Sequence, residues 1–328
     1  MKGIILHGGH GTRLRPLTHT GPKQLLPIAN KPMSEYCVDA IRDCGISEIA
    51  IIIGGIGSNK VKEYYGDGSK FNVKITYIEQ DEPKGIAHAI NLCQEFIGDE
   101  KFLVFLGDNI IQKPIADFVE NFNKSDYDAT VLLCEVDNPS RFGIADVKNE
   151  KIVKITEKPK KPTSNLAVTG IYLLTPLIFE VIDNLKPSWR NELEITDALD
   201  NLLKQNDNIG YETITDYWKD TGTPEDILNA NRQVLEHICN QTGWPCIIGK
   251  NCKIDESASI GPNVSIGDDT IISSDVVIEN SIIMSDCKID GGLNIKDSII
   301  SANCHLHGNN KDKTKKVFLL GEGTKITL

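Results

Sequence analysis

The sequence predicts an α/β domain built on a Rossmann-like mixed, mostly parallel sheet, followed by a small parallel β-helix. Over roughly the first 230 residues, short β-branched runs alternate with longer amphipathic stretches, which is typical of α/β folds. Past residue 243 this rhythm stops, and an apolar residue recurs at every sixth position. We therefore expect two domains, residues 1–240 and residues 241–328.

The first domain is predicted to begin with a strand and to alternate strands with helices. Apolar, β-branched runs predict strands over Gly3–His7, Ile49–Ile53, Val73–Ile78, Phe102–Leu106, Ala129–Val136, Ile152–Thr156 and Gly170–Leu174. Helical spacing of apolar residues predicts helices over Lys31–Cys44, Asn59–Tyr65, Gly85–Phe96, Pro114–Phe122, Ile195–Leu203 and Pro224–His237. This order of elements favours a doubly wound sheet.

The second domain is predicted from its six-residue repeat. The recurring apolar residues are Ile248, Ile254, Ile260, Ile266, Ile272, Ile278 and Met284, after which the register slips by one and continues through Ile283, Ile289 and Ile295. Six is a multiple of the two-residue period of a strand, so these side chains share one face and can point into a coil. We expect about three coils, then a loop over Gly308–Lys316 and a last strand at Val317–Leu320.

The composition limits the class of function. The chain has 35 Lys and Arg against 46 Asp and Glu, a net charge of −11, which argues against a nucleic-acid partner because such proteins usually present a basic face. No apolar run is long enough to span a bilayer, and no signal peptide precedes the first strand, so we expect no membrane partner and a cytoplasmic protein. Nine scattered cysteines without a C-x-x-C pair favour reduced thiols.

A glycine-rich turn follows the first strand. Gly8, Gly9 and Gly11 lie within four residues and lead into Thr12 and Arg13. Glycines allow backbone N–H groups to approach a ligand closely, and phosphate is the ligand we expect. The turn matches neither the G-x-G-x-x-G dinucleotide fingerprint nor the P-loop.

The charge pattern around this turn supports a phosphate site. The first 34 residues contain no Asp or Glu but carry five cations, Lys2, Arg13, Arg15, Lys23 and Lys31. An acidic protein therefore keeps a cationic segment at its N-terminus. Local positive charge of this kind can attract anionic ligands to a protein whose net charge is negative.

The segment GGHGTRLRPLTHTGPKQLLPIANKPM resembles the signature of sugar-1-phosphate nucleotidylyltransferases, and Pro22–Pro27 most resembles the glucose-1-phosphate thymidylyltransferases. The resemblance continues in order to about residue 235 through Gly85–Ala89, Leu106–Asn109, Phe142–Gly143, Glu157–Pro159, Thr169–Tyr172, Glu192–Asp197 and Trp218–Pro224. The hexapeptide tail is similar to that of longer members, whose β-helix is left-handed. One departure is His7, where the family more often has a small residue, so the floor of the pocket can differ.

The resemblance implies transfer of a thymidylyl group from dTTP to glucose 1-phosphate, with Mg²⁺ as cofactor. Asp108 follows a buried strand, where α/β sheets place ligands, and the resemblance implies that Asp108 and Asp220 bind the metal. Arg13 and Lys23, together with Asp108, are the expected catalytic residues, the two cations acting as a clamp on the triphosphate.

The remaining site residues are also implied by the resemblance. The expected nucleotide-binding set is Leu6, Gly8, Gly9, Gly11, Thr12, Arg13, Gln80, Gly85 and Asp108, with Gln80 and Gly85 reading the base. The expected sugar-phosphate set is Gly143, Glu157, Lys158, Thr169 and Tyr172.

Three other interpretations stay open from the sequence. The same chemistry can use UTP or another hexose 1-phosphate. A catalytically silent regulatory or scaffold subunit would keep the fold without the activity, and His305 and His307 in the tail raise a hexapeptide acyltransferase as a third hypothesis. Because a β-helix leaves an exposed end, we also expect a homo-oligomer.

Overall fold

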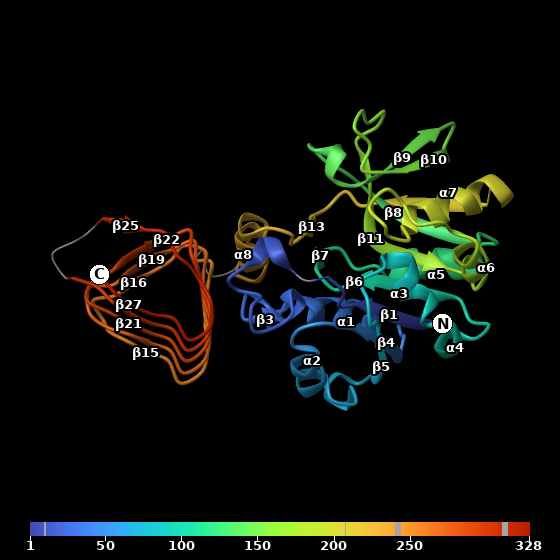
Figure 1. Cartoon of the computed structure of the whole chain (residues 1–328). Coiled ribbons are helices and arrows are strands. Elements are labelled where there is room, and N and C mark those ends of the chain that lie inside the picture. Colours follow the sequence, from blue (N-terminus) through green and yellow to red (C-terminus); the bar gives the residue numbers. More distant parts are fainter. Residues whose placement is uncertain (10, 207, 240–243, 310–313) are drawn as a thin grey trace. The chain divides into compact units, whose positions relative to one another are not determined.

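The computed structural model describes residues 1–328 except residues 10, 207, 240–243 and 310–313. The chain divides into two compact units, one made of residues 1–9 and 34–218 and the other of residues 10–33 and 219–328. Figure 1 labels their helices and strands. The domain boundary expected after residue 240 lies outside the described residues.

The first unit is built on a mixed sheet, which among the described residues has nine strands. Its strands are β1 (Lys2–Leu6), β4 (Glu48–Ile53), β5 (Lys74–Glu79), β6 (Phe102–Leu106), β8 (Ala129–Glu135), β9 (Gly143–Lys148), β10 (Lys151–Glu157), β11 (Leu166–Leu174) and β12 (Ile209–Thr213). The order is β10-β9-β11-β6-β1-β4-β5, and β8 pairs with both β11 and β12. This arrangement confirms the predicted fold class.

The parallel part of the sheet positions the glycine turn. Strand β1 pairs in parallel with β4 and with β6, and Leu6 lies opposite Leu106 in that register. The carboxyl ends of β1 and β6 therefore lie at one edge, and the N–H of Gly107 donates to the carbonyl of Leu6 at 3.0 Å. The segments after these two strands, which carry Gly8 and Asp108, are brought side by side at the edge where α/β sheets bind ligands.

The helices that cover this sheet are α1 (Met33–Asp43), α2 (Ser58–Tyr65), α3 (Ile86–Asn91), α4 (Gln94–Ile97), α5 (Ala116–Lys124), α6 (Leu177–Asp183) and α7 (Ile195–Asn206). Apolar residues of α3, α6 and α7 join Ile4 and Leu6 in one buried core. Helix α6 was not predicted, and the helix predicted over Gly85–Phe96 is divided into α3 and α4. Helix α1 begins two residues later than predicted, because Lys31–Pro32 forms strand β3 with β2 (Pro27–Ile28).

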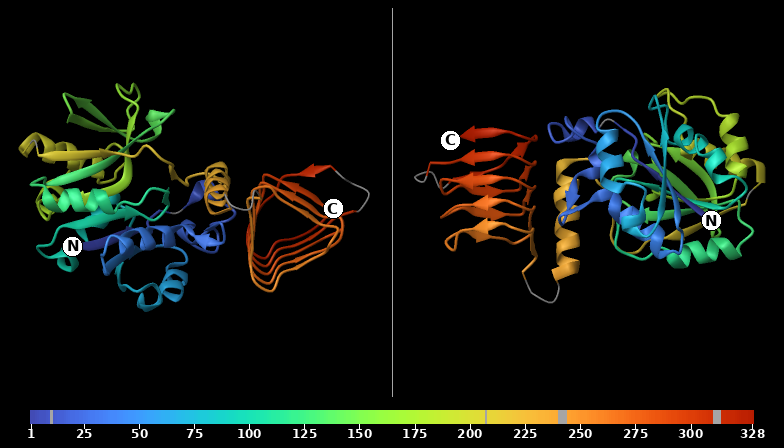
Figure 2. Two further views of the ribbon diagram at one scale, coloured as in Figure 1. Left: turned by 180° about the vertical axis from the view of Figure 1, so that it is seen from behind. Right: turned by 90° about the horizontal axis from the view of Figure 1, so that it is seen from below.

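The second unit contains α8 (Pro224–Cys239) and a three-sided parallel β-helix, whose triangular coils are seen in the left-hand view of Figure 2. Its strands are β14 (Cys246–Ile248), β15 (Lys253–Ile254), β16 (Ser259–Ile260), β17 (Val264–Ile266), β18 (Ile271–Ile272), β19 (Val277–Glu279), β20 (Ile282–Ile283), β21 (Lys288–Asp290), β22 (Asn294–Lys296), β23 (Ile299–Ile300), β24 (His305–His307), β25 (Lys315–Lys316), β26 (Leu319–Leu320) and β27 (Lys325–Thr327). The repeat-based prediction of this fold is confirmed.

The register slip has a structural explanation. Ile248 pairs with Ile266 eighteen positions later, whereas Ile266 pairs with Ile283 only seventeen positions later. Ile283 is therefore the inward residue, and placing Met284 in the repeat was wrong. The estimate of three coils was also wrong, because the described residues form sheets of five, five and four strands. Strand β27 follows the segment predicted to be last.

The segment 10–33 and α8 belong to the same unit as the β-helix and cover one of its sides. Ile282 and Ile299 face away from the inner core of the coils, yet both are buried. The side chain of Asn231 on α8 accepts hydrogen bonds from the backbone N–H of Ala29 at 2.8 Å and from the hydroxyl of Ser265 at 3.0 Å. Polar contacts thus fix α8 against both neighbours. None of the described helices has the length and apolar character needed to cross a membrane.

His7 lies directly after β1 and is buried in the first unit. Its backbone N–H donates to Ile52, and its ring meets that of Tyr65 edge-on at 6.1 Å. Within the described chain, neither ring nitrogen has a hydrogen-bond partner. Burial lowers the pKa of His7 to about 3, and the nearby charge of Asp108 offsets only part of this effect. His7 is therefore a neutral imidazole at physiological pH.

We expect His7 to make the protein acid-sensitive. The unfolded chain binds a proton at His7 near pH 6.5 while the folded chain does not until about pH 3, so stability falls as pH drops through this window. The free energy of unfolding should decrease by about 2 kcal/mol between pH 7 and pH 5 from this residue alone. Urea unfolding at both pH values measures it. His7→Ala should flatten the slope, and an unchanged slope in this variant would contradict the assignment.

Candidate functional site

The glycine turn after β1 faces the side chain of Gln80. Gly9 has φ of +95°, a conformation that glycine adopts without strain. A Cβ at Gly8 would lie 3.6 Å from Oε1 of Gln80. The turn and the Gln80 amide therefore border the same space. His10, which completes the motif, lies outside the described residues.

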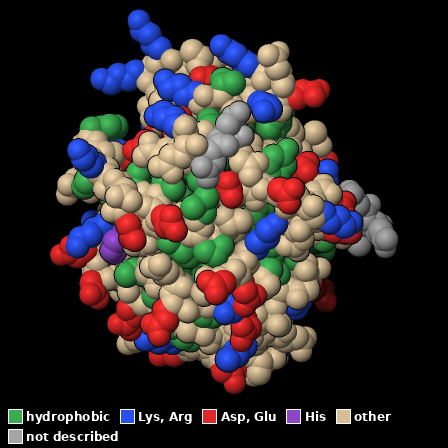
Figure 3. Space-filling view, turned by 90° about the vertical axis from the view of Figure 1, so that its right-hand side faces the viewer, with side chains coloured by type: hydrophobic (Ala, Val, Ile, Leu, Met, Phe, Trp, Pro, Cys, Tyr) green, Lys and Arg blue, Asp and Glu red, His purple; other side chains and the backbone are tan. Residues whose placement is uncertain are grey.

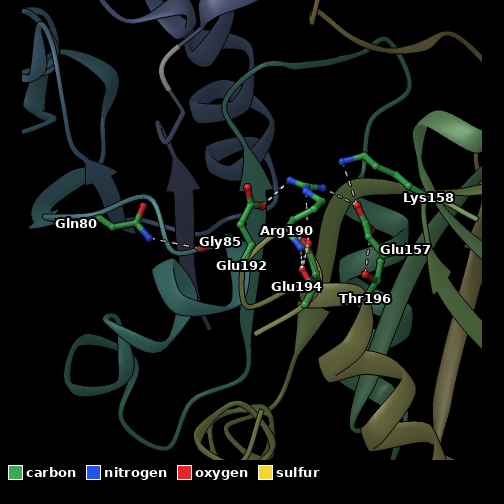
Figure 4. A network of polar contacts seen from close by, with 9 residues as sticks. Gln80, Gly85, Glu157, Lys158, Arg190, Glu192, Glu194 and Thr196 are labelled. Carbon is green, nitrogen blue, oxygen red and sulfur yellow. Dashed lines mark hydrogen bonds and ion pairs between the residues drawn. The ribbon is translucent and has the colours of Figure 1, made fainter. Parts of the chain in front are cut away.

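The carboxamide of Gln80 is oriented by two contacts. Gln80 is buried, and its Nε2 donates to the carbonyl of Gly85 at 3.4 Å and lies 2.9 Å from Nδ1 of His88. Figure 4 shows the amide pointing from its strand end toward Gly85. A fixed amide of this kind can donate to and accept from the edge of a base. The structure thus brings Gln80 and Gly85 together, as the sequence predicted for them.

Gly85 serves as the docking point of the loop that precedes α7. It has φ of +106°, and a Cβ there would lie 2.4 Å from the carbonyl oxygen of Leu193. The N–H of Leu193 donates to Lys84 at 2.7 Å, and the N–H of Ala87 donates to Leu193 at 3.1 Å. Only glycine permits so close an approach of the two backbones. The segment around Leu193 is therefore held against the start of α3.

Arg190, in the same loop, is surrounded by carboxylates. Its Nη1 lies 3.3 Å from Glu157, its Nη2 lies 2.5 Å from Glu192, and its Nε lies 3.7 Å from Glu194. Burial raises the pKa of Glu194, although a hydrogen bond from the Ser188 hydroxyl partly opposes the rise. The guanidinium therefore compensates a concentration of negative charge in a partly buried position.

Glu157, at the end of β10, is the centre of the polar network drawn in Figure 4. The hydroxyl of Thr196 donates to its Oε2 at 2.9 Å, and the ammonium of Lys158 lies 3.1 Å from its Oε1. A Cβ at Gly143 would lie 3.2 Å from Oε2 and would clash with Thr196, so this position leaves room beside the carboxylate. Lys158 has φ of +39°, a backbone conformation that non-glycine residues rarely adopt.

Strand β11 adds two buried polar residues. Thr169 is fully buried, and in the described part of the chain its hydroxyl oxygen has no hydrogen-bond partner. Burial raises the pKa of Tyr172, and the charges of Glu157 and Asp108 raise it further, so its phenol stays protonated. The structure therefore brings Gly143, Glu157 and Lys158 together, and it places Tyr172 within the electrostatic reach of Glu157.

Asp108 follows β6 and is oriented through its neighbour Asn109. The side-chain Nδ2 of Asn109 donates to Oδ1 of Asp108 at 3.0 Å, and the indole N–H of Trp218 donates to the side-chain Oδ1 of Asn109 at 2.7 Å. A Cβ at Gly170 would lie 2.7 Å from that amide. These contacts fix Asn109 and leave Asp108 partly exposed at the edge of the sheet.

The second unit holds the other predicted residues. Gly11 has φ of +57° and its carbonyl accepts a hydrogen bond from Thr18 at 2.8 Å, which closes the start of the short helix Thr12–Leu14. A Cβ at Gly222 would lie 3.1 Å from Nη2 of Arg13 and 3.2 Å from Oδ2 of Asp220. Arg13 and Asp220 therefore border the same glycine. Lys23 is the first residue of a second short helix, Lys23–Leu25.

Sequence reasoning missed Arg190, Thr196 and Asn109. Thr196 and Asn109 lie in the segments Glu192–Asp197 and Leu106–Asn109, which supported the resemblance without being given a role. Arg190 lies two residues before the first of them. Only their position within or beside a matching segment could have pointed to these residues. No local sequence pattern shows which carboxylate a side chain will contact in the folded protein.

The carboxylates expected to bind the metal suit a hard divalent cation that is also bound by substrate and water. Across the described ranges, no group of three or more His, Cys, Asp and Glu side chains is arranged to hold a metal ion. Mg²⁺ does not need one, because it is commonly held by one or two carboxylates with substrate oxygens and water completing its shell. Asp108 and Asp220 are hard oxygen donors of that type.

The first unit thus combines a mixed α/β sheet with a glycine turn, an oriented amide and a carboxylate flanked by cations. The chain belongs to the nucleotidyl transferase family, whose model matches residues 2–237. Residues 243–327 match the GMPPB C-terminal domain.

Sequence and structure comparisons with known proteins support this family assignment. The chain is 49% identical over 237 residues to the low-salt glycan biosynthesis nucleotidyltransferase Agl11 of Haloferax volcanii; the match covers 72% of this chain and 66% of the relative. A Bacillus anthracis protein assigned as a glucose-1-phosphate thymidylyltransferase and solved with sucrose is 44% identical, with a TM-score of 0.68 over 71% of this chain and 94% of its own. A UDP-glucose pyrophosphorylase solved with UDP-glucose is 29% identical, with a TM-score of 0.65 over 72% and 98%.

The contact between Gly85 and Leu193 predicts a large cost for a side chain. Gly85→Ala would place Cβ against backbone atoms that cannot move aside and would strain a positive φ, so we expect a loss of more than about 2 kcal/mol in the free energy of unfolding. Gly98→Ala is the matched control: its φ is also positive, but nothing lies within 4 Å, so it should cost only about 1 kcal/mol. Chemical unfolding compares the two variants, and equal losses would contradict the docking role.

Proposed function

We propose that the protein is a sugar-1-phosphate nucleotidylyltransferase that transfers a thymidylyl group from dTTP to glucose 1-phosphate, giving dTDP-glucose and pyrophosphate. The observation that carries the proposal is Glu157 with Lys158 and Arg190 beside it. A carboxylate accepts hydrogen bonds from sugar hydroxyls, while a lysine and an arginine bind phosphate oxygens. A site with both functions fits a phosphorylated sugar better than either group alone.

In the proposed reaction, a phosphate oxygen of the sugar phosphate attacks the α-phosphorus of the nucleotide. A new P–O bond forms there, and the bond to the pyrophosphate leaving group breaks. The substrate supplies the nucleophile, so the protein's part is to orient two anions and reduce their repulsion. Lys158 and Arg190 would bind the sugar phosphate, Arg13 and Lys23 the triphosphate, and Gln80 the base.

Asp108 and Asp220 are the proposed ligands of Mg²⁺. When bound, Mg²⁺ would neutralise phosphate oxygens and help hold the nucleotide for displacement. The hydrogen bond from Asn109 engages Oδ1 of Asp108, and the bond from Trp218 in turn fixes Asn109. This chain of bonds would keep the carboxylate in one orientation.

Use of UTP is the second candidate. The similarity to a UDP-glucose pyrophosphorylase supports it. The two nucleotides differ at the base methyl group and at this hydroxyl, so neither the glycine turn nor Gln80 by itself separates them.

Pyrophosphate release tests the proposal directly. The purified protein would be assayed with Mg²⁺ and each of dTTP, UTP, GTP, ATP and CTP against glucose, galactose, mannose and N-acetylglucosamine 1-phosphates. We expect the highest kcat/KM for dTTP with glucose 1-phosphate. A preference for UTP would support the second candidate, and no release from any pair would support the scaffold hypothesis. Acetyl-CoA turnover, run in parallel, tests the acyltransferase hypothesis.

Asp108→Asn should lower kcat by about 10²- to 10³-fold, because the amide keeps the shape of the side chain but loses the charge that a metal requires. Steady-state pyrophosphate release measures the loss, and circular dichroism checks the fold. Asp99→Asn, at an exposed turn, is the control and should retain the activity of the unmodified protein. Near-normal turnover by Asp108→Asn would remove Asp108 from the catalytic set.

A further inference from the structure

A lysine cluster lies beside the sugar-phosphate residues. Residues 148–161, from the end of β9 through β10 into the following loop, contain six lysines and two glutamates, in a chain whose net charge is −11. The lysines are Lys148, Lys151, Lys154, Lys158, Lys160 and Lys161. In Figure 3, Lys and Arg side chains gather at the top of the view, where Figure 1 places β9 and β10, and acidic side chains are more frequent below.

Most of this positive charge is uncompensated by ion pairs. Lys148, Lys154, Lys160 and Lys161 are exposed, and no described carboxylate forms an ion pair with any of them. Glu157 is instead engaged by Lys158, Arg190 and Thr196. Asp146 lies opposite Lys154 in the strand register and accepts a hydrogen bond from Thr163, whereas Lys160 and Lys161 lie beyond the strand. Like charges in sequence repel one another rather than stabilise the fold, and their positive potential can act on solutes.

The strand register places these lysines at graded distances from the pocket. Glu157 pairs with Gly143 at one end of the hairpin, and Lys151 pairs with Lys148 at the other. At about 3.3 Å per residue, the Lys148–Lys151 end is roughly 20 Å from Glu157. Lys154 and Lys160 are each three residues from Glu157, and Lys161 is four away, so none can be more than about 14 Å distant along the chain.

We propose that Lys154, Lys160 and Lys161 concentrate anionic sugar phosphate near Glu157 by their electrostatic field, without contacting the bound substrate. This inference rests on the proposed function, in which the substrate is a phosphate dianion. A protein of net charge −11 repels such a solute in general, and a local positive potential opposes that repulsion near Glu157. The Debye length near physiological salt is about 8 Å, so the distant end of the hairpin contributes much less.

The test compares two variants of equal charge change. Lys160→Gln/Lys161→Gln removes the near pair, and Lys148→Gln/Lys151→Gln removes the distant pair as the matched control. At about 20 mM salt and saturating nucleotide, the near variant should lower kcat/KM for glucose 1-phosphate about three- to ten-fold with kcat unchanged. The difference should vanish at about 0.5 M salt, and near 0.15 M the distant variant should change kcat/KM less than about two-fold.

Several outcomes would overturn the proposal. A near variant with unchanged kcat/KM at low salt would show that the lysines do not act on the substrate. A loss that persists at high salt, or one that falls on kcat, would show a direct contact or a structural role. Equal losses of kcat/KM in the near and distant variants at 0.15 M salt would show that the effect does not depend on distance from Glu157. A change in molecular mass by light scattering would assign the effect to self-association.

Failure of the proposed function is distinguishable from failure of this inference. If the unmodified protein releases no pyrophosphate from any substrate pair, binding of inorganic phosphate is measured by isothermal titration calorimetry across the same salt range. Weaker phosphate binding by the near variant at low salt, restored to equality at high salt, would support the lysine field on its own. Identical binding by the unmodified protein and both variants would overturn it.

Discussion

The arrangement of the candidate sugar-phosphate site depends on one cation, the guanidinium of Arg190. It lies between Glu157, Glu192 and Glu194, and without it three carboxylates would face one another in a partly buried space. Repulsion there would displace Glu157, whose position also determines where Lys158 lies. Arg190 itself is held because its loop docks through Leu193 on Gly85, so a backbone contact close to Gln80 also fixes the surroundings of Glu157.

Two cationic regions of this chain coincide with its candidate sites. The acid-free first 34 residues carry Arg13 and Lys23, and the hairpin β9–β10 with its following loop carries the lysine cluster. Acidic residues supply the rest of the net charge and are mostly exposed, where they favour solubility and contribute little to folding. The net charge of −11 therefore reflects the surface as a whole, whereas the local balance of charge indicates which ligands a site can bind.

The parts of the fold that follow a local rule could be predicted. Apolar runs identified β1, β4 and β6, and the six-residue period identified the β-helix. Both could be predicted because buried side chains recur at a fixed residue spacing in a strand and in a coil. The number of coils could not be read in this way, because the spacing is seventeen positions between Ile283 and Ile300 but twenty between Ile300 and Leu320. In addition, Leu306 stands opposite Ile289 in place of an isoleucine. The assignment of residues 10–33 to the second unit depends on contacts such as Ala29 with Asn231, 202 positions apart, and no local pattern encodes them.

The same distinction applies to the site. Glu157 and Lys158 could be assigned from a resemblance, but Arg190 gains its role only because folding brings it to Glu157, 33 positions away. In the structure, the pair Arg190–Glu157 joins the group proposed for phosphate to the group proposed for hydroxyls. A ligand that offers both an anion and neighbouring hydroxyls can replace each partner with one of its own, so neither charge is left uncompensated. Inorganic phosphate can replace only the partner of the cation, so under the proposed function we expect this site to bind a sugar phosphate more tightly than phosphate alone.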